Sequence, residues 1–183
     1  TTLLEQILDS HPRLQVMDEK PVLAAVLSTH EKLLKNYPES LALLTDNDIK
    51  ELRASYFDHV DKYISRSPQC KLIDKMPNNL VHIGLIQKIF SGAKFILAIR
   101  HPYDVCLSNF MQLFRLNNAM ATSLSLNDAA IAYNEVMSLW IHYEKTIHPK
   151  YHLIRYEDLV DDIEKEARAL LGFCLLYTSD AAD

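Results

Sequence analysis

The sequence predicts an α/β fold in which a parallel β-sheet is flanked by helices. Four short apolar segments have the composition of strands and lie at residues 13–18, 70–74, 94–99 and 151–155. Segments whose apolar residues recur at helical spacing separate these strands. Segment 94–99 is nearly all apolar, which is typical of a buried parallel strand. Strands that alternate with helices favour a parallel sheet covered on both faces.

The first third of the chain is predicted to alternate helices with one strand. Apolar residues recur at helical spacing in 1–8, and strand 13–18 is followed by a helix over 21–34. Thr45 and Asp48 form a capping-box pattern that predicts the start of a long helix. One face of that helix is apolar and consists of Ile49, Leu52, Tyr56, Val60 and Tyr63.

The middle of the chain is predicted to hold two strands and two helices. After strand 70–74 we expect a loop over 75–79 and a helix over 80–90. Strand 94–99 comes next, and Pro102 suits the first turn of the helix that follows.

The last third is predicted to be a long helix, a strand and a shorter helix. Ser125 and Asp128 repeat the capping-box pattern, and the helix they open is expected to reach about His148. Strand 151–155 and a helix over 164–171 follow.

Composition limits the classes of function. With 183 residues, 49% of them apolar, the chain suits one domain with its own core. Its net charge of −5 argues against non-specific binding of nucleic acid. No apolar run approaches the roughly 20 residues of a membrane helix. The widely spaced Cys70, Cys106 and Cys174 form no CxxC or Cys/His cluster, so we expect a cytoplasmic protein without a metal site.

The segment from Lys94 to Gln112 points to anion binding. An apolar run ends at Arg100, Pro102 follows, and Ser108 lies eight residues after the arginine. The N-terminus of a helix attracts phosphate or carboxylate groups, and the planar donors of arginine suit phosphate. The pattern therefore predicts a site for a phosphorylated nucleotide. A solvated arginine and a serine on a helix surface, without a ligand, would produce the same sequence pattern.

Five short motifs occur along the chain in this order: Thr1-Thr2 followed by LLEQILDSHP, the pair Asp18-Glu19, DKMPNN at Asp74–Asn79, Arg100 with Ser108, and YEDL at Tyr156–Leu159. Together they resemble the superfamily of sulfotransferases that use 3′-phosphoadenosine 5′-phosphosulfate (PAPS). The resemblance is strongest to the branch of bacterial TPR-associated sulfotransferases, related to tyrosylprotein sulfotransferases.

The resemblance covers residues 1–174 and implies a P-loop-NTPase-like sulfotransferase fold. That fold would be incomplete, because only Thr1 and Thr2 of the phosphosulfate loop are present, and the C-terminal cofactor loop is missing. Residues 175–183, LLYTSDAAD, are expected to be a non-native tail, because they resemble translated sequencing adapter.

The resemblance implies catalytic roles for two residues. Glu19 would take the proton of the acceptor hydroxyl, and Lys75 would stabilise negative charge on the transferring group. Asp18 stands where the family usually has glycine. The sequence alone leaves open that Glu19 and Lys75 are ordinary charged residues next to strand ends.

Five residues would bind the donor PAPS. Arg100 and Ser108 would hold its 3′-phosphate, Thr1 and Thr2 would close the phosphosulfate loop, and Tyr156 would lie beside a nucleotide phosphate. Glu157 and Asp158 are expected to cap a helix or pair locally.

The predicted reaction transfers a sulfuryl group from PAPS to an acceptor hydroxyl without a metal. The acceptor could be a peptide tyrosine, a sugar or a small molecule. Two other functions stay open: a nucleotide kinase, which would need the GxxxxGK[ST] loop that this chain lacks, and a non-catalytic interaction module. The chain by itself could also be an inactive fragment of an active enzyme.

Overall fold

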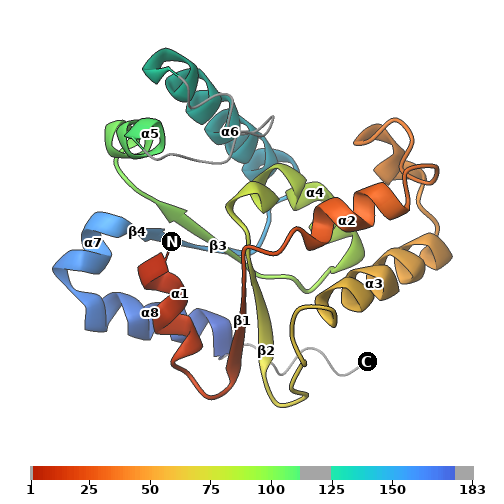
Figure 1. Cartoon of the computed structure of the whole chain (residues 1–183), viewed down its shortest axis with the longest axis horizontal. Coiled ribbons are helices and arrows are strands. Elements are labelled where there is room, and N and C mark those ends of the chain that lie inside the picture. Colours follow the sequence, from red (N-terminus) through yellow and green to blue (C-terminus); the bar gives the residue numbers. More distant parts are fainter. Residues whose placement is uncertain (1, 112–124, 176–183) are drawn as a thin grey trace. The chain divides into compact units, whose positions relative to one another are not determined.

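The computed structural model describes residues 2–111 and 125–175 and divides into two compact units, Thr1–Ala93 and Lys94–Asp183. Each unit contains a pair of parallel strands with helices packed beside them (Figure 1). The predicted α/β class with parallel strands is therefore confirmed. In the part of the chain that is described, no helix is long and apolar enough to cross a membrane.

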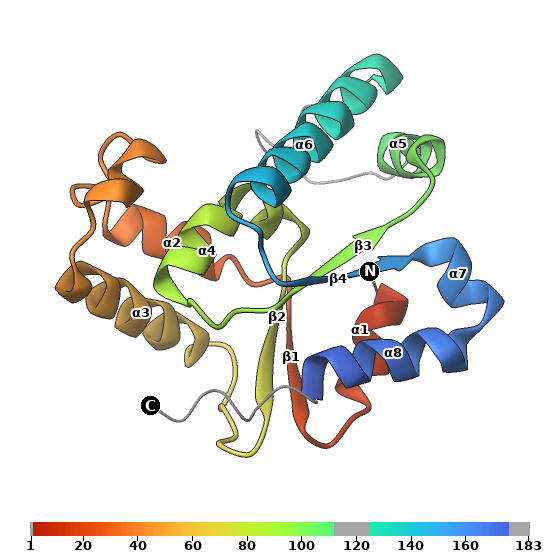
Figure 2. The ribbon, with the colours of Figure 1, turned by 180° about the vertical axis from the view of Figure 1, so that it is seen from behind.

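The first unit is built on strands β1 and β2, which lie side by side in Figures 1 and 2. Leu14 is paired with Lys71 at one end, and Asp18 with Lys75 at the other. The elements of this unit are α1 (Thr2–Asp9), β1 (Leu14–Asp18), α2 (Val22–Thr29), η1 (Glu39–Leu43), α3 (Asp46–Val60), β2 (Lys71–Lys75), η2 (Pro77–His82) and α4 (Ile83–Ile89).

The core of this unit lies where α2, α3 and α4 pack together with the end of β1. Its most deeply buried side chains are Met17, Val22, Val26, Leu52, Val60, Leu85 and Ile89. Full burial of such a side chain stabilises the fold by about 1.5–3 kcal/mol. Of the apolar face predicted for α3, Leu52 and Val60 are among them, but Tyr63 lies beyond the end of the helix and is 46% exposed.

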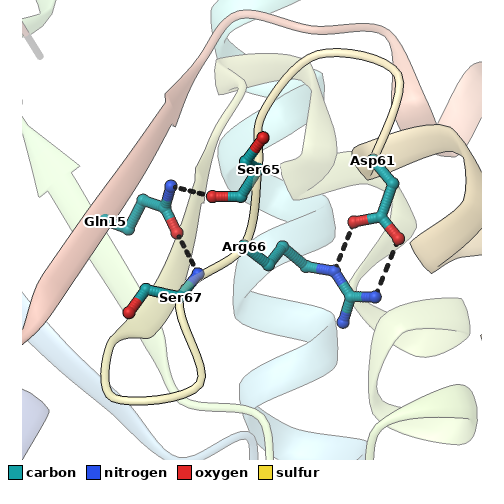
Figure 3. Close-up of polar contacts among 5 residues, drawn as sticks. All are labelled: Gln15, Asp61, Ser65, Arg66 and Ser67. Carbon is teal, nitrogen blue, oxygen red and sulfur yellow. Dashed lines mark hydrogen bonds and ion pairs between the residues drawn. The ribbon is translucent and has the colours of Figure 1, made fainter.

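The loop between α3 and β2 is fixed to β1 by the side chain of Gln15 (Figure 3). Its Nε2 donates to the carbonyl of Ser65 at 2.9 Å, and its Oε1 accepts from the amide of Ser67 at 3.1 Å. Between them, Arg66 forms a bidentate pair with Asp61. These contacts hold the start of β2 in register with β1.

The second unit is built on β3 and β4, with Phe95 paired to Tyr151 and Ile99 to Arg155. Helix α5 packs against α6, and α7 and α8 contact β4 (Figure 2). The elements are β3 (Phe95–Ile99), α5 (Pro102–Met111), α6 (Leu126–Thr146), β4 (Tyr151–Arg155), α7 (Tyr156–Asp161) and α8 (Ile163–Leu175).

Local capping chemistry sets the starts of both long helices. Thr45 and Asp48 form the complete reciprocal box at the start of α3. At α6, the Ser125 hydroxyl accepts from the amide of Asp128 at 3.0 Å and donates to its carboxylate at 2.7 Å. The predicted helix starts at both positions are confirmed.

The structure corrects a predicted loop and a predicted helix end, and it adds a helix. The predicted loop over 75–79 is wrong, because Lys75 ends β2 and Pro77–His82 form a 3₁₀ turn before α4. Proline disfavours a helical conformation in the residue before it and is well suited to a first helical position, so the turn begins at Pro77. Helix α2 ends at Thr29 instead of residue 34, and α7 forms a helix that the sequence did not predict.

Candidate active site

In the first unit, candidate site residues lie where β1 and β2 end. Because the strands are parallel, their carboxyl ends meet, and Asp18 is paired with Lys75. The amide of Glu19 donates to the carbonyl of Lys75 at 2.8 Å, and Lys75 Nζ donates to Glu19 Oε1 at 2.9 Å. The structure thus brings together the two residues that were predicted to be catalytic.

Glu19 has a left-handed backbone conformation, with φ of 45°. A residue with a side chain rarely adopts this conformation, and it persists only where surrounding contacts hold it. The backbone and side-chain bonds to Lys75 supply those contacts. Asp18 is the last residue of β1, so the unusual conformation belongs to the residue after the strand.

Lys75 has two further carboxylate partners, Glu5 and Asp18. Glu5 Oε2 of α1 lies 3.1 Å from Lys75 Nζ, and Asp18 Oδ1 also contacts it. Partial burial acts to lower the pKa of Lys75, but hydrogen bonds to Asp18, Glu19 and Glu5 outweigh it and raise the pKa above its ordinary value. Lys75 is therefore a fixed cation in this structure.

A buried hydrogen-bonded pair, Tyr56 and Asp74, lies at the end of β2 next to Lys75. The hydroxyl of Tyr56 in α3 donates to Asp74 Oδ2 at 2.9 Å. Burial raises the pKa of Asp74, against the opposing hydrogen bonds from Tyr56 and Asn79. Burial, followed by the charge of Asp74, likewise raises the pKa of Tyr56. The pair links α3 to the residue next to Lys75.

Thr2 is the first residue of α1 and is exposed, whereas Thr1 lies outside the described residues. Thr2 and Glu5 are three residues apart on one helix, so they share a face. Because Glu5 reaches Lys75, that face of α1 is turned toward the end of β2.

The second unit places Arg100 and Tyr156 together. Arg100 follows β3, and its guanidinium carbon lies 5.2 Å from the centre of the Tyr156 ring. A guanidinium nitrogen also lies 3.4 Å from Asp104 Oδ2, and the arginine side chain is 42% exposed. Its donors therefore remain accessible to a ligand. Ser108 lies in the second turn of α5 and is half-buried.

Glu157 links the start of α7 to the start of α5. Its Oε1 accepts from the amide of His101 at 2.8 Å, immediately before α5 begins at Pro102. The bond to this amide is the main reason that the pKa of Glu157 lies below its ordinary value. A helix cap or a local pair was expected for Glu157, but its bond reaches a backbone amide 56 residues away and fixes the turn that carries Arg100.

Some of the missed contacts had a signal in the sequence. Predicted parallel strands ending at Asp18 and Asp74 already place the charged residues of both strand ends close together. Glu5 had none, since its contact depends on how α1 packs. Within the described ranges, no group of three or more His, Cys, Asp and Glu residues is arranged to hold a metal ion.

Comparisons with known proteins agree with this architecture. Residues 1–180 match the model of the Sulfotransferase family, so the chain belongs to that family. An uncharacterized protein of Aquifex aeolicus (strain VF5) is 30% identical over 98% of this chain and 24% of its own length.

Two protein-tyrosine sulfotransferases also match nearly the whole chain. That of Drosophila melanogaster is 25% identical over 99% of this chain and 37% of its own length. Protein-tyrosine sulfotransferase 1 of Danio rerio is 26% identical over 99% of this chain and 51% of its own length. The chain thus spans about half or less of these curated relatives.

A solved structure shows the same fold. The sulfotransferase domain from the curacin biosynthetic pathway superimposes with a TM-score of 0.62 and 20% identity, covering 94% of this chain and 69% of that one. The fold of this chain is therefore that of a sulfotransferase domain.

Proposed function

We propose that the protein transfers a sulfuryl group from PAPS to an acceptor hydroxyl. The observation that carries the proposal is the contact between Lys75 and Glu19 at the ends of two parallel strands, in a chain that belongs to the sulfotransferase family. A fixed cation beside a carboxylate supplies the two groups that such a transfer requires.

In this reaction, the acceptor oxygen attacks sulfur in line with the bridging oxygen of the phosphosulfate. The new O–S bond forms as the S–O bond to that bridging oxygen breaks, and Glu19 takes the acceptor proton. Lys75 stabilises the charge that develops on the leaving oxygen. The products are the sulfated acceptor and adenosine 3′,5′-bisphosphate.

Each unit contains residues that we propose as contacts of the donor. In the second unit, the exposed donors of Arg100 would bind the 3′-phosphate together with Ser108, and Tyr156 would lie beside the nucleotide. In the first unit, Thr1 and Thr2 would contact the 5′-phosphosulfate from the start of α1. A half-exposed guanidinium at the end of a parallel strand is chemically suited to a phosphate.

For the acceptor we propose a tyrosine of a peptide, because two curated relatives are protein-tyrosine sulfotransferases. A sugar or small-molecule hydroxyl would use the same base and cation.

The test is transfer of ³⁵S from labelled PAPS to a tyrosine-containing peptide. Glu19→Gln and Lys75→Ala should each lower kcat by about 100-fold or more, as loss of a general base or of a transition-state cation does in other enzymes. Transfer of phosphate from ATP would favour a kinase, and donor binding without turnover would favour an interaction module. Either outcome would contradict sulfuryl transfer by this chain.

Donor binding is tested separately by thermal melting. Adenosine 3′,5′-bisphosphate should raise the Tm, by an amount that follows its affinity, whereas 5′-AMP should raise it less. Arg100→Ala should abolish the difference between the two ligands. Equal shifts by both ligands in the wild type would argue against a 3′-phosphate site.

A further inference from the structure

Lys75 Nζ contacts three carboxylates, and their exposure separates them into two kinds. An ammonium group has three N–H donors, and here all three have carboxylates within ion-pair distance. The side chains of Asp18 and Glu19 are 55% and 56% exposed. The Glu5 side chain is only 20% exposed, and that of Lys75 only 14%.

The difference in exposure determines which carboxylate stays paired with Lys75 when an anionic donor binds. One ammonium cannot neutralise three carboxylates, so the group carries a surplus of negative charge that opposes a sulfate. Exposed carboxylates can turn toward water at little cost, because surface ion pairs are weak and screened. Glu5 cannot do so as easily, since leaving Lys75 would strand a largely buried charge.

Glu5 also connects Lys75 to the helix that carries the proposed phosphosulfate contacts. It lies one turn after Thr2 on the same face of α1, and Lys75 ends β2. The ion pair at 3.1 Å therefore fixes the distance between the start of α1 and the ammonium group.

We propose that Glu5 is a positioning residue that holds Lys75 against the transferring sulfuryl group. When the donor binds, Asp18 and Glu19 release Lys75, and Glu19 turns to the acceptor. The proposal rests on the proposed sulfuryl transfer, but the pairing of Glu5 with Lys75 can be measured without it.

The first measurement is the rate at which acetic anhydride acylates Lys75, followed by peptide mass spectrometry in the full protein and normalised to exposed Lys32. Only a neutral amine reacts. Glu5→Gln should raise the Lys75 rate by about tenfold, the change that corresponds to one pKa unit. The hydrogen bond from Lys75 to Asp18 contributes more than that to Glu5 to the raised pKa in this structure, but the exposed Asp18 carboxylate is screened by water, so Asp18→Asn should raise the rate by much less. Glu164→Gln, which removes an exposed ion pair with Arg168, is the matched control and should leave the rate unchanged.

The second measurement is the kinetics of ³⁵S transfer. Glu5→Gln should lower kcat by about tenfold with little change in the KM for PAPS, because a misplaced Lys75 would stabilise the transition state less while donor binding stays nearly the same. A merely structural role for Glu5 would lower the Tm without this division between kcat and KM.

A wild-type measurement covers the case in which Glu5→Gln does not fold. Raising the salt concentration from 50 to 500 mM should change the Lys75 acylation rate by less than about twofold, because a largely buried pair is screened little. A rise as large as tenfold would overturn the proposal, as would equal effects of Glu5→Gln and Asp18→Asn. If the acylation results hold but the wild type transfers no sulfuryl group, the proposed function fails and the pairing stands.

Discussion

Replacing Tyr56 with phenylalanine should destabilise the first unit in a pH-dependent way. The change removes only the hydroxyl that donates to Asp74 Oδ2 at 2.9 Å. The other carboxylate oxygen, Asp74 Oδ1, is buried, and without the Tyr56 hydroxyl the carboxylate would keep its hydrogen bond from Asn79. Losing a donor to a buried charged group costs about 1–3 kcal/mol, so Tyr56→Phe should lower the free energy of unfolding by that amount at pH 7.

The pH dependence follows from the direction of the Asp74 shift. Its pKa in the folded protein lies above the ordinary value of 3.8, so the folded state binds this proton more tightly than the unfolded state. Asp74 therefore contributes stability that is fully present below pH 3.8 and is lost as the pH rises through the folded-state pKa. Without the Tyr56 hydroxyl this pKa rises further, and the variant should lose more stability than the wild type between pH 4 and 7.

Urea unfolding of both proteins at pH 4.5 and pH 7 measures this difference. Tyr63→Phe is the matched control. Tyr63 is 46% exposed, so removing its hydroxyl should change the free energy of unfolding by less than about 0.5 kcal/mol. In the background of Asp74→Asn, which cannot ionise, the effect of Tyr56→Phe should no longer depend on pH. A destabilisation that is equal at both pH values would refute the reasoning.

Two further changes test the core and the second unit. Leu52→Ala, at a side chain with no exposed surface, should lower the free energy of unfolding by about 2–5 kcal/mol, measured by urea unfolding, and an effect below about 1 kcal/mol would contradict the packing of α3. Glu157→Ala should lower the Tm above pH 4.5, and its difference from the wild type should shrink as the pH falls through the depressed pKa of Glu157. Glu157→Gln keeps an acceptor for the amide of His101 and should retain part of the stability; a full loss would mean that charge alone matters.

The strands and the helix starts could be predicted because short-range chemistry determines them. Each predicted strand lies within one residue of its observed bounds, since apolar runs end at charged or turn-forming residues such as Asp18 and Arg100. Thr45 and Ser125 cap their helices through residues three positions away. Where the prediction failed, at Pro77–His82 and Tyr156–Asp161, the segments are only six residues long and too short to show apolar periodicity.

The site was only partly predictable, because its contacts join distant positions. Glu19 and Lys75 are 56 residues apart, and their contact depends on the register of two parallel strands. Strand composition predicts that both strand ends meet at one edge, so this pair could be anticipated. The pairing of Glu5 with Lys75 depends on the packing of α1, which local patterns do not specify.

The charge state of Lys75 bears on which residue can move a proton in the proposed reaction. The hydrogen bonds to its three carboxylates raise its pKa above an already high ordinary value of 10.5, so the ammonium stays protonated at neutral pH. Such a group can stabilise negative charge, but it cannot accept the acceptor's proton. Proton removal then falls to a neighbouring carboxylate that can turn toward the acceptor, and the more exposed Glu19, held in a left-handed conformation beside Lys75, meets that requirement better than the largely buried Glu5.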